Sequence, residues 1–219
     1  MSASFDIAEG LARLGASGGV VASLPADARE KLAAYIVLLQ KWNATYNLTA
    51  IREPERMLTH HVLDALAVLP HLSALAACPG WRVLDVGSGG GVPAIPLAIA
   101  RPEWHVVALD SNHKKGAFLQ QAINELPLPN AEAVVARVEE YAPAAPFDLV
   151  ISRAFSDLAT FVEAGARHLA PGGRLIAMKG VFPDEEIAAL PPTVHVVATP
   201  ALEVPGLDAQ RHLIVMVRA

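Results

Sequence analysis

The chain has 219 residues, of which 53% are hydrophobic and 18% are charged, and its formal net charge is −5. These values exclude a disordered chain and predict one sizeable folded domain with room for a modest extension. The acidic balance argues against a long basic groove for nucleic acid but leaves a local basic patch open.

The start of the chain, M-S-A-S-F-D-I-A-E-G, has no basic segment typical of a secretion signal. No apolar run reaches the roughly 18 residues that a membrane span needs. We therefore expect a cytoplasmic protein with no membrane contact, and we expect a monomer. Cys78 is the single cysteine, which excludes an internal disulfide and a cysteine-based zinc cluster. We expect Cys78 to be a small apolar filler in a linker.

Helical patterns dominate the first third of the chain. Residues 24–42 and 53–69 carry apolar side chains at helical spacing, and Pro54 stands where the first turn of a helix tolerates proline. We expect residues 1–78 to form an N-terminal helical extension. It joins a domain spanning residues 79–219 without a long linker, so that the chain is one compact unit.

Seven β-rich runs follow, separated mostly by helical stretches. They lie at residues 81–86, 104–110, 131–136, 147–152, 174–179, 194–199 and 212–218. This alternation predicts an α/β fold with a mostly parallel, doubly wound sheet covered on both faces. The last two runs have no long helix between them, so we expect an antiparallel pair at the edge of the sheet.

A glycine-rich turn follows the first of these strands, in D-V-G-S-G-G-G-V-P-A-I-P-L at residues 85–97. Val92 occupies the position where a dinucleotide-binding fingerprint needs its third glycine, which weakens that interpretation. No lysine directly follows a glycine, so the phosphate-binding loop of nucleotide hydrolases is absent.

The remaining pattern is an aspartate followed by alternating glycines: Asp85, Gly87, Gly89 and Gly91. Glycines let the backbone approach a ligand closely, and the neighbouring carboxylate can bind an ammonium group. We expect the next helix to start near Val92, with its N-terminus toward the ligand.

An aspartate also ends the second strand. Asp110 stands where an acidic residue can accept hydrogen bonds from a ribose. Together with the glycine turn, it makes S-adenosylmethionine the leading ligand. Other nucleotides, or a degenerate relative of the fold, stay open as alternatives.

Several longer stretches carry a more specific signal. They are K-W-N-A-T-Y-N-L-T at 41–49, H-H-V-L-D-A at 60–65, the glycine turn, R-V-E-E at 137–140, V-I-S-R-A at 150–154, M-K-G at 178–180 and R-H-L-I-V at 211–215. With these stretches, the chain resembles the glucose-inhibited division protein B family, also called ribosomal small-subunit RNA methyltransferase G. The resemblance runs from about residue 30 to the C-terminus. Ala65 and Met178 depart from residues common in the family, Ser and Leu, without touching the cofactor argument.

The resemblance implies a class I S-adenosylmethionine-dependent methyltransferase fold. It further implies methyl transfer to N7 of one guanine in the decoding region of 16S ribosomal RNA, within the small subunit or an assembly intermediate. By position in the family, cofactor contacts fall on Gly87, Val92, Val138, Glu139 and Arg153, in addition to Asp85, Gly89 and Asp110 from the pattern above. Without the family, Glu139 reads as a solvated carboxylate at a helix start.

Arg153 is the residue to which we assign the catalytic role. It ends the fourth strand beside the glycine turn, where its guanidinium contacts either the cofactor or the O6 and N7 acceptors of the guanine. We expect it to position a reactant rather than to move a proton, and we expect no general base.

Substrate contacts are expected at Asn43, Asn47, His61, Lys114, Lys179 and Arg211. Each has a plainer alternative. The two asparagines cap or shape a loop, Lys114 and the neighbouring Lys115 form a solvated pair, and Lys179 and Arg211 are solvated at strand ends.

Other side chains in the helical extension favour structural interpretations. Trp42 and Tyr46 lie four residues apart, which indicates core packing rather than base stacking. His60, His61 and Asp64 invite a metal site, but His61 and Asp64, three residues apart and with no third ligand, make a poor one. We expect no metal and assign these side chains to orienting a nearby loop.

Two further function classes stay open: a small-molecule or protein methyltransferase on the same fold, and a non-catalytic module that binds the cofactor or RNA. The fourth strand ends in S-R-A-F, unlike the N-P-P-Y-like runs of amino-group methyltransferases. Cys78 precedes the first strand, so it is badly placed as the nucleophile that cytosine C5 methylation requires.

Overall fold

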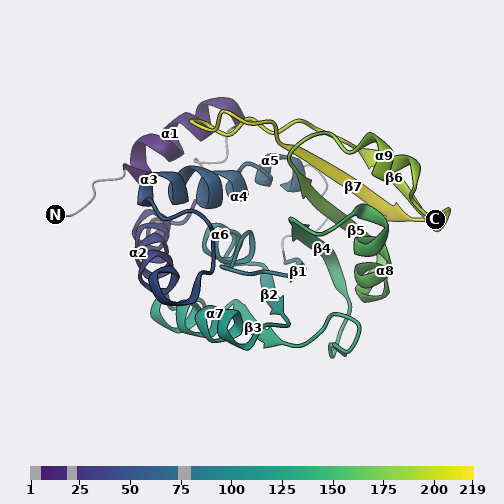
Figure 1. The fold of residues 1–219 in the computed structure, drawn as a ribbon, viewed down its shortest axis with the longest axis horizontal. Helices are drawn as coiled ribbons and strands as arrows, with labels where there is room; N and C mark the ends of the chain where they lie inside the picture. The colour runs from purple at the N-terminus through teal and green to yellow at the C-terminus, as the bar shows by residue number, and fades with distance from the viewer. Residues whose placement is uncertain (1–5, 19–23, 74–79) are drawn as a thin grey trace.

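A computed structural model describes residues 6–18, 24–73 and 80–219. At its centre is a seven-stranded sheet with the strand order β3-β2-β1-β4-β5-β7-β6 (Figure 1). The strands are β1 (Arg82–Val86), β2 (His105–Asp110), β3 (Ala131–Val135), β4 (Phe147–Arg153), β5 (Leu169–Lys179), β6 (Val194–Ala198) and β7 (His212–Arg218). The first five are parallel and β7 is antiparallel to both neighbours, which confirms the predicted mostly parallel sheet.

The last two strands form the predicted antiparallel pair at the edge of the sheet, with β6 outermost. β7 pairs with β5 from Arg174↔Val217 to Lys179↔His212 and thus lies inside the sheet. The reason is burial: β7 has four consecutive buried residues, whereas most of β6 is at least partly exposed. A strand buried on both faces needs a neighbour on each side.

Helices cover both faces of the sheet. They are α1 (Ile7–Gly18), α2 (Ala28–Tyr46), α3 (Pro54–Met57), α4 (Asp64–Leu66), α5 (Leu69–Ser73), α6 (Ala94–Ala100), α7 (His113–Glu125), α8 (Leu158–Gly165) and α9 (Asp184–Ala188). In Figure 1, α2, α6 and α7 lie on one side of the sheet, and α8 and α9 lie on the other. Consecutive strand residues alternate between the two cores: Val83 packs in one and Leu84 in the other.

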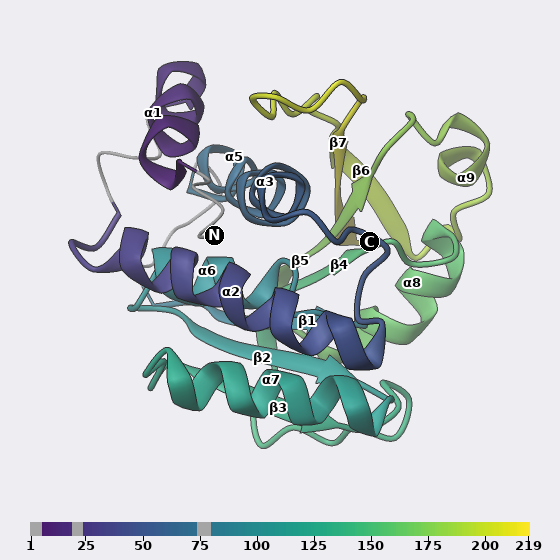
Figure 2. The same ribbon diagram turned by 60° about the vertical axis from the view of Figure 1, so that its left-hand side comes forward.

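The N-terminal helices share a core with the sheet. Helix α2 packs against α6 and α7 and runs along them in Figure 2. The rings of Trp42 and Phe118 lie 5.7 Å apart, and those of Tyr35 and Phe118 lie 6.5 Å apart. The predicted core role holds for Trp42, whereas Tyr46 is 43% exposed, with its ring tilted by 37° against that of Trp42. The predicted boundary between residues 78 and 79, and the linker around Cys78, are not covered by the described ranges.

The helix predicted over residues 53–69 is helical from Pro54 to Leu66, but its hydrogen-bond pattern changes within that span. Between α3 and α4 lies a π-helical segment, Leu58–Leu63, and α5 follows after a short turn. Apolar spacing cannot reveal this segment, because hydrogen bonds to the fifth rather than the fourth residue leave nearly the same apolar stripe. The segment carries His60 and His61. Short π-helical turns inside α-helices are frequent at functional sites.

Helix α6 begins at Ala94, two residues later than predicted. Pro93 has no N–H to donate, and the N–H of Ala94 donates to Oδ2 of Asp85 at 3.2 Å. The turn therefore ends only after the proline. Within the described ranges, no helix combines the length and the apolar character needed to cross a membrane.

Candidate functional site

The backbone leaves β1 through a turn in left-handed conformations. Gly87, Gly89 and Gly91 have φ of 74°, 60° and 83°, values that side chains rarely tolerate. A Cβ on Gly87 would meet no atom within 4 Å, so this glycine faces open space. A Cβ on Gly91 would come within 2.5 Å of Ile95 Cγ1, so that glycine permits close packing instead.

Asp85 lies beneath this turn and is fully buried. Its Oδ2 accepts hydrogen bonds from the Ser88 hydroxyl at 2.6 Å and from the Ala94 N–H at 3.2 Å. Its Oδ1 is buried without a hydrogen-bond partner in the described part of the chain. Burial raises the pKa of this carboxyl to about 7, against the lowering effect of the Ser88 hydrogen bond. An orphaned buried oxygen of this kind calls for a cationic or donor group from outside the protein.

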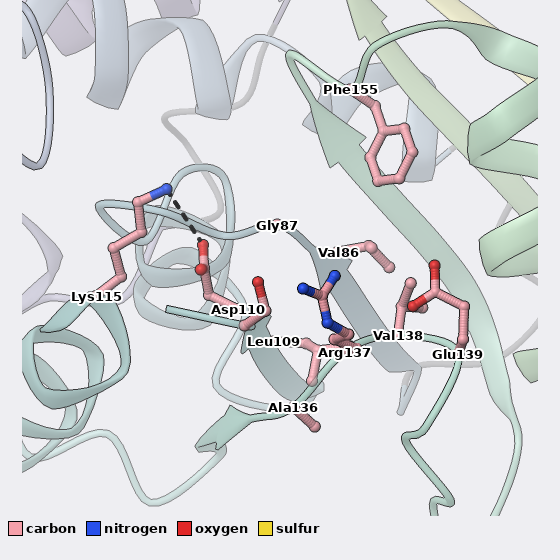
Figure 3. Close-up of a pocket in the computed structure, with 11 residues that line it drawn as sticks. Val86, Gly87, Leu109, Asp110, Lys115, Ala136, Arg137, Val138, Glu139 and Phe155 are labelled. Atoms are coloured by element: carbon pink, nitrogen blue, oxygen red, sulfur yellow. Dashed lines mark ion pairs between the residues drawn. The ribbon is translucent and has the colours of Figure 1, made fainter. Parts of the chain in front are cut away.

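A cavity of about 290 Å³ opens on one side of the turn, and we name it the β2 cavity (Figure 3). It is lined by Val86, Gly87, Leu109, Asp110, Ser111, Lys115, Ala136, Arg137, Val138, Glu139 and Phe155. Asp110 accepts hydrogen bonds from the N–H groups of Gly89 and Asn112, both at 2.9 Å, and lies 3.7 Å from Lys115 Nζ. Figure 3 shows Phe155 and Asp110 on different sides of this space, with Glu139 on a third.

Two further cavities continue from it. The β4 cavity, about 150 Å³, is lined by Leu39, Leu48, Thr49, His61, Gly87, Ser88, Gly89, Gly90, Val92, Arg153 and Ala154. The β5 cavity, about 320 Å³, is lined by Asp64, Arg153, Ala154, Met178, Lys179, Gly180 and Arg211. Gly87 borders the first two cavities, and Arg153 and Ala154 border the last two. The three spaces therefore adjoin along the carboxyl ends of the parallel strands, where α/β folds bind ligands.

The structure brings the predicted cofactor residues to these cavities. Gly87, Asp110, Val138 and Glu139 line the β2 cavity, Gly89, Val92 and Arg153 line the β4 cavity, and Asp85 lies beneath the turn. Arg153 is held from behind: its Nη1 donates to the His60 carbonyl at 2.6 Å and to Asp64 at 3.1 Å. Its guanidinium thus has a fixed place on the wall between the β4 and β5 cavities.

The predicted substrate residues divide into two groups. His61 lines the β4 cavity, and Lys179 and Arg211 line the β5 cavity, where Lys179 is paired with Glu186 at 2.7 Å. Lys114 is exposed at the start of α7, and its neighbour Lys115 is the one that reaches the β2 cavity.

Both asparagines organise the loop after α2. The buried amide of Asn43 accepts from the Thr49 N–H and donates to the Ile51 carbonyl. Asn47 ends α2 in a left-handed conformation, and its Oδ1 accepts from Arg52 at 3.4 Å. These bonds favour loop shaping over direct substrate contact for the two residues.

His61 is 5% exposed, and burial together with Arg153 lowers the pKa of its imidazole to about 3. It is therefore neutral at physiological pH and is not poised to accept a proton. Nowhere in the described ranges do three or more histidine, cysteine or acidic side chains gather as a metal site would require.

Sequence reasoning missed Arg137, Phe155 and Tyr35. Arg137 and Phe155 stand beside residues that the resemblance did select, at the ends of β3 and β4, so the strand-end rule could have found them. No local pattern identifies Tyr35, because its partner lies 55 residues away.

Comparisons with known proteins agree on one group. A model of the family described as rRNA small subunit methyltransferase G matches residues 28–214. The ribosomal RNA small subunit methyltransferase G of Nitrosospira multiformis is 50% identical over 100% of this chain and 99% of its own length. That of Chromobacterium violaceum is 55% identical over 86% of this chain and 88% of its own.

A solved structure supports the fold. An S-adenosylmethionine-dependent methyltransferase from Aquifex aeolicus superposes with a TM-score of 0.57 over 83% of this chain and 98% of its own. At 17% identity, this likeness concerns the fold alone.

A hydrogen bond joins the helical extension to the glycine turn: the Tyr35 hydroxyl donates to the Gly90 carbonyl at 2.5 Å. Burial raises the pKa of Tyr35, so the hydroxyl stays a donor. We expect Tyr35→Phe to lower the free energy of unfolding by about 1–2 kcal/mol, because the carbonyl loses its donor. Urea unfolding measures this. Tyr46→Phe is the matched control, since the Tyr46 hydroxyl has no bond in the described residues; an equal loss in both variants would contradict the assignment.

Proposed function

The chain belongs to the rRNA small subunit methyltransferase G family, and on that premise we propose that it transfers a methyl group from S-adenosylmethionine to N7 of one guanine in 16S ribosomal RNA. The observation that carries the proposal is the orphaned carboxylate oxygen of Asp85 under an open glycine turn that borders the β2 and β4 cavities. We propose the small ribosomal subunit or an assembly intermediate as the substrate, and the cytoplasm as the site of action.

The residues present fit this cofactor. Asp85 offers a bare buried oxygen to the ammonium of the amino-acid part, and Gly87 leaves free the space that the backbone approach needs. Asp110 offers a carboxylate to a ribose at the mouth of the β2 cavity. Val138 and Phe155 supply apolar walls for a base, with Glu139 beside them. When bound, S-adenosylmethionine supplies a methyl group attached to a positively charged sulfur.

The acceptor side falls to the β5 cavity. Its wall offers two guanidinium groups, from Arg153 and Arg211, and an apolar surface from Met178 and Ala154. Guanidinium groups donate to phosphate oxygens and to the O6 acceptor of guanine. These residues would hold a nucleotide against the boundary with the β4 cavity, which supports Arg153 as the positioning residue.

The site has little machinery for proton transfer, and N7 needs none. Guanine N7 carries an in-plane lone pair and no proton, so its methylation requires no general base. His61 has a pKa near 3, and its Nδ1 lies 3.2 Å from Arg153 Nη2. What the residues contribute is therefore orientation of the acceptor, which by itself is worth several orders of magnitude in rate.

The proposed function is tested by mass mapping of 16S ribosomal RNA from cells with and without the gene. We expect one guanine to lose its methyl group and to regain it when the gene is restored. Restoration with Gly87→Val should fail, because its side chain fills the open space at the turn. An unchanged map would instead favour a small-molecule or protein substrate.

Cofactor affinity should depend on pH through Asp85. The carboxyl is largely protonated below its pKa of about 7, and an ammonium partner requires the ionised form, so binding must release a proton at lower pH. We expect the affinity to rise with pH, by up to about tenfold per unit, between about pH 5.5 and 7, and then to level off.

Calorimetry in buffers of different ionisation enthalpy measures both the affinity and the released proton. Asp85→Asn should bind more weakly at all pH values and show no such rise. Asp110→Asn, which changes the other carboxylate of the site, should keep it. A rise that persists in Asp85→Asn would assign the titration to another group.

The chemical step should be insensitive to pH once the cofactor is saturating. In single turnovers on the small subunit, we expect a nearly flat rate between about pH 6 and 8.5, where a histidine of ordinary pKa would titrate. Arg153→Gln should lower the rate equally across this range, because arginine does not titrate there. A rate that climbs tenfold per unit and loses this slope in His60→Ala or His61→Ala would show that a base is required.

A further inference from the structure

Asp64 forms ion pairs with two arginines, one at each of its carboxylate oxygens. Its Oδ2 lies 3.1 Å from Arg153 Nη1, and its Oδ1 lies 3.0 Å from Arg211 Nε. The aspartate side chain is 1% exposed, whereas the arginines are 24% and 22% exposed. Asp64 begins α4, Arg153 ends β4 and Arg211 directly precedes β7, so the ion pairs join the helical extension to two strands of the sheet.

Both guanidinium groups border the β5 cavity, and each also forms an ion pair with Asp64. Arg211 uses Nε on Asp64 and Nη1 on the Gln210 carbonyl, which leaves Nη2 without a partner in the described part of the chain. Two like charges on one wall repel each other, and the carboxylate between them offsets that repulsion. The same carboxylate fixes the orientation of each guanidinium group, because charge-assisted hydrogen bonds from a guanidinium are directional.

His61 is a further hydrogen-bond partner of Arg153. Its Nδ1 lies 3.2 Å from Arg153 Nη2, and its Nε2 lies 2.9 Å from Thr49 Oγ1. Because arginine only donates, Nδ1 must accept, and the ring hydrogen is on Nε2 and points to Thr49. The His60 carbonyl near Nδ1 then receives its hydrogen bond from Arg153 Nη1. The wall of the cavity is thus held by an ordered network that starts in the helical extension.

We propose that Asp64 is a positioning residue for methyl transfer: it acts through Arg153 and Arg211, holding both guanidinium groups in the orientation that receives the acceptor nucleotide in the β5 cavity. This inference rests on the proposed function. The Asp64 side chain is only 1% exposed where it borders the β5 cavity, so it acts on the acceptor through the two arginines and needs no direct contact with either reactant. One carboxylate against two guanidinium groups leaves a single surplus positive charge on this wall, since Lys179 is offset by Glu186. A nucleotide, with its phosphate and its base acceptors, has the complementary chemistry.

The test compares Asp64→Asn with the wild type in single turnovers on the small subunit at saturating cofactor. Asparagine keeps the size and one acceptor but turns an amide N–H toward one arginine. We expect the rate of methyl transfer to fall by about tenfold to a hundredfold, as for a misplaced reactant. Cofactor affinity, measured by calorimetry, should change less than the rate, because Asp64 borders the β5 cavity and neither the β2 nor the β4 cavity. Asp64→Glu, which keeps the charge, should recover part of the rate.

Non-additivity separates this role from a merely structural one. If Asp64 acts only through the arginines, adding Asp64→Asn to an Arg153→Gln, Arg211→Gln background should cost no further activity. Asp148→Asn is the matched control: Asp148 accepts from the Arg82 N–H at 2.8 Å at the opposite end of β4, and its loss should leave the rate unchanged. If Asp64→Asn alone does not fold, the double variant Asp64→Asn/Arg211→Gln replaces it, because this variant removes one uncompensated positive charge. Its rate is then compared with that of Arg211→Gln.

The outcomes are distinct. A wild-type rate in Asp64→Asn, a full additional loss in the arginine-free background, or an equal loss of cofactor affinity would each overturn the proposal. Absence of methyl transfer by the wild type to the small subunit would instead overturn the proposed function, because this measurement does not depend on any substitution of Asp64.

Discussion

The conformation of the turn after β1 is the constraint on which the site depends. Three left-handed residues let the chain reverse at the carboxyl end of a buried strand. The N–H groups of Gly87 and Ser88 then donate to the Leu109 carbonyl, at 2.9 and 3.0 Å, and fix the turn to β2. Asp85 is buried beneath this turn, and its Oδ1 has no hydrogen-bond partner among the described residues. The turn borders both the β2 cavity and the β4 cavity.

Sequence patterns predicted the parts of this arrangement that local order determines. The seven β-rich runs correspond to the seven strands. Asp85 is the last but one residue of β1, and Asp110 ends the neighbouring parallel strand β2. Parallel pairing alone then brings both carboxylates to one edge, because the register sets Asp85 opposite Ala108. The family resemblance selected Val138, Glu139 and Arg153, whose cofactor roles remain predictions.

What the sequence did not indicate depends on contacts between distant segments. Periodicity gave no sign that β7 would insert beside β5, since strand order follows from total burial rather than from the pattern of one strand. The ion pairs of Asp64 join residues 89 and 147 positions away. Read locally, His61 and Asp64 suggested only a poor metal site or a loop contact. Their partners became visible when the fold placed the ends of β4 and β7 against α4.

The helical extension is thus part of the site and not an appendage. It supplies Leu39, Leu48, Thr49 and His61 to the β4 cavity and Asp64 to the β5 cavity. Because the cations on this wall are mostly offset by Asp64 and Glu186, and the chain as a whole is acidic, we expect weak electrostatic attraction for free RNA. Discrimination must then come from the fixed geometry of a few donors. Fixed geometry requires a rigid support. Here that support is the contact of α2 with the glycine turn, and of the π-helical segment and α4 with Arg153 at the end of β4.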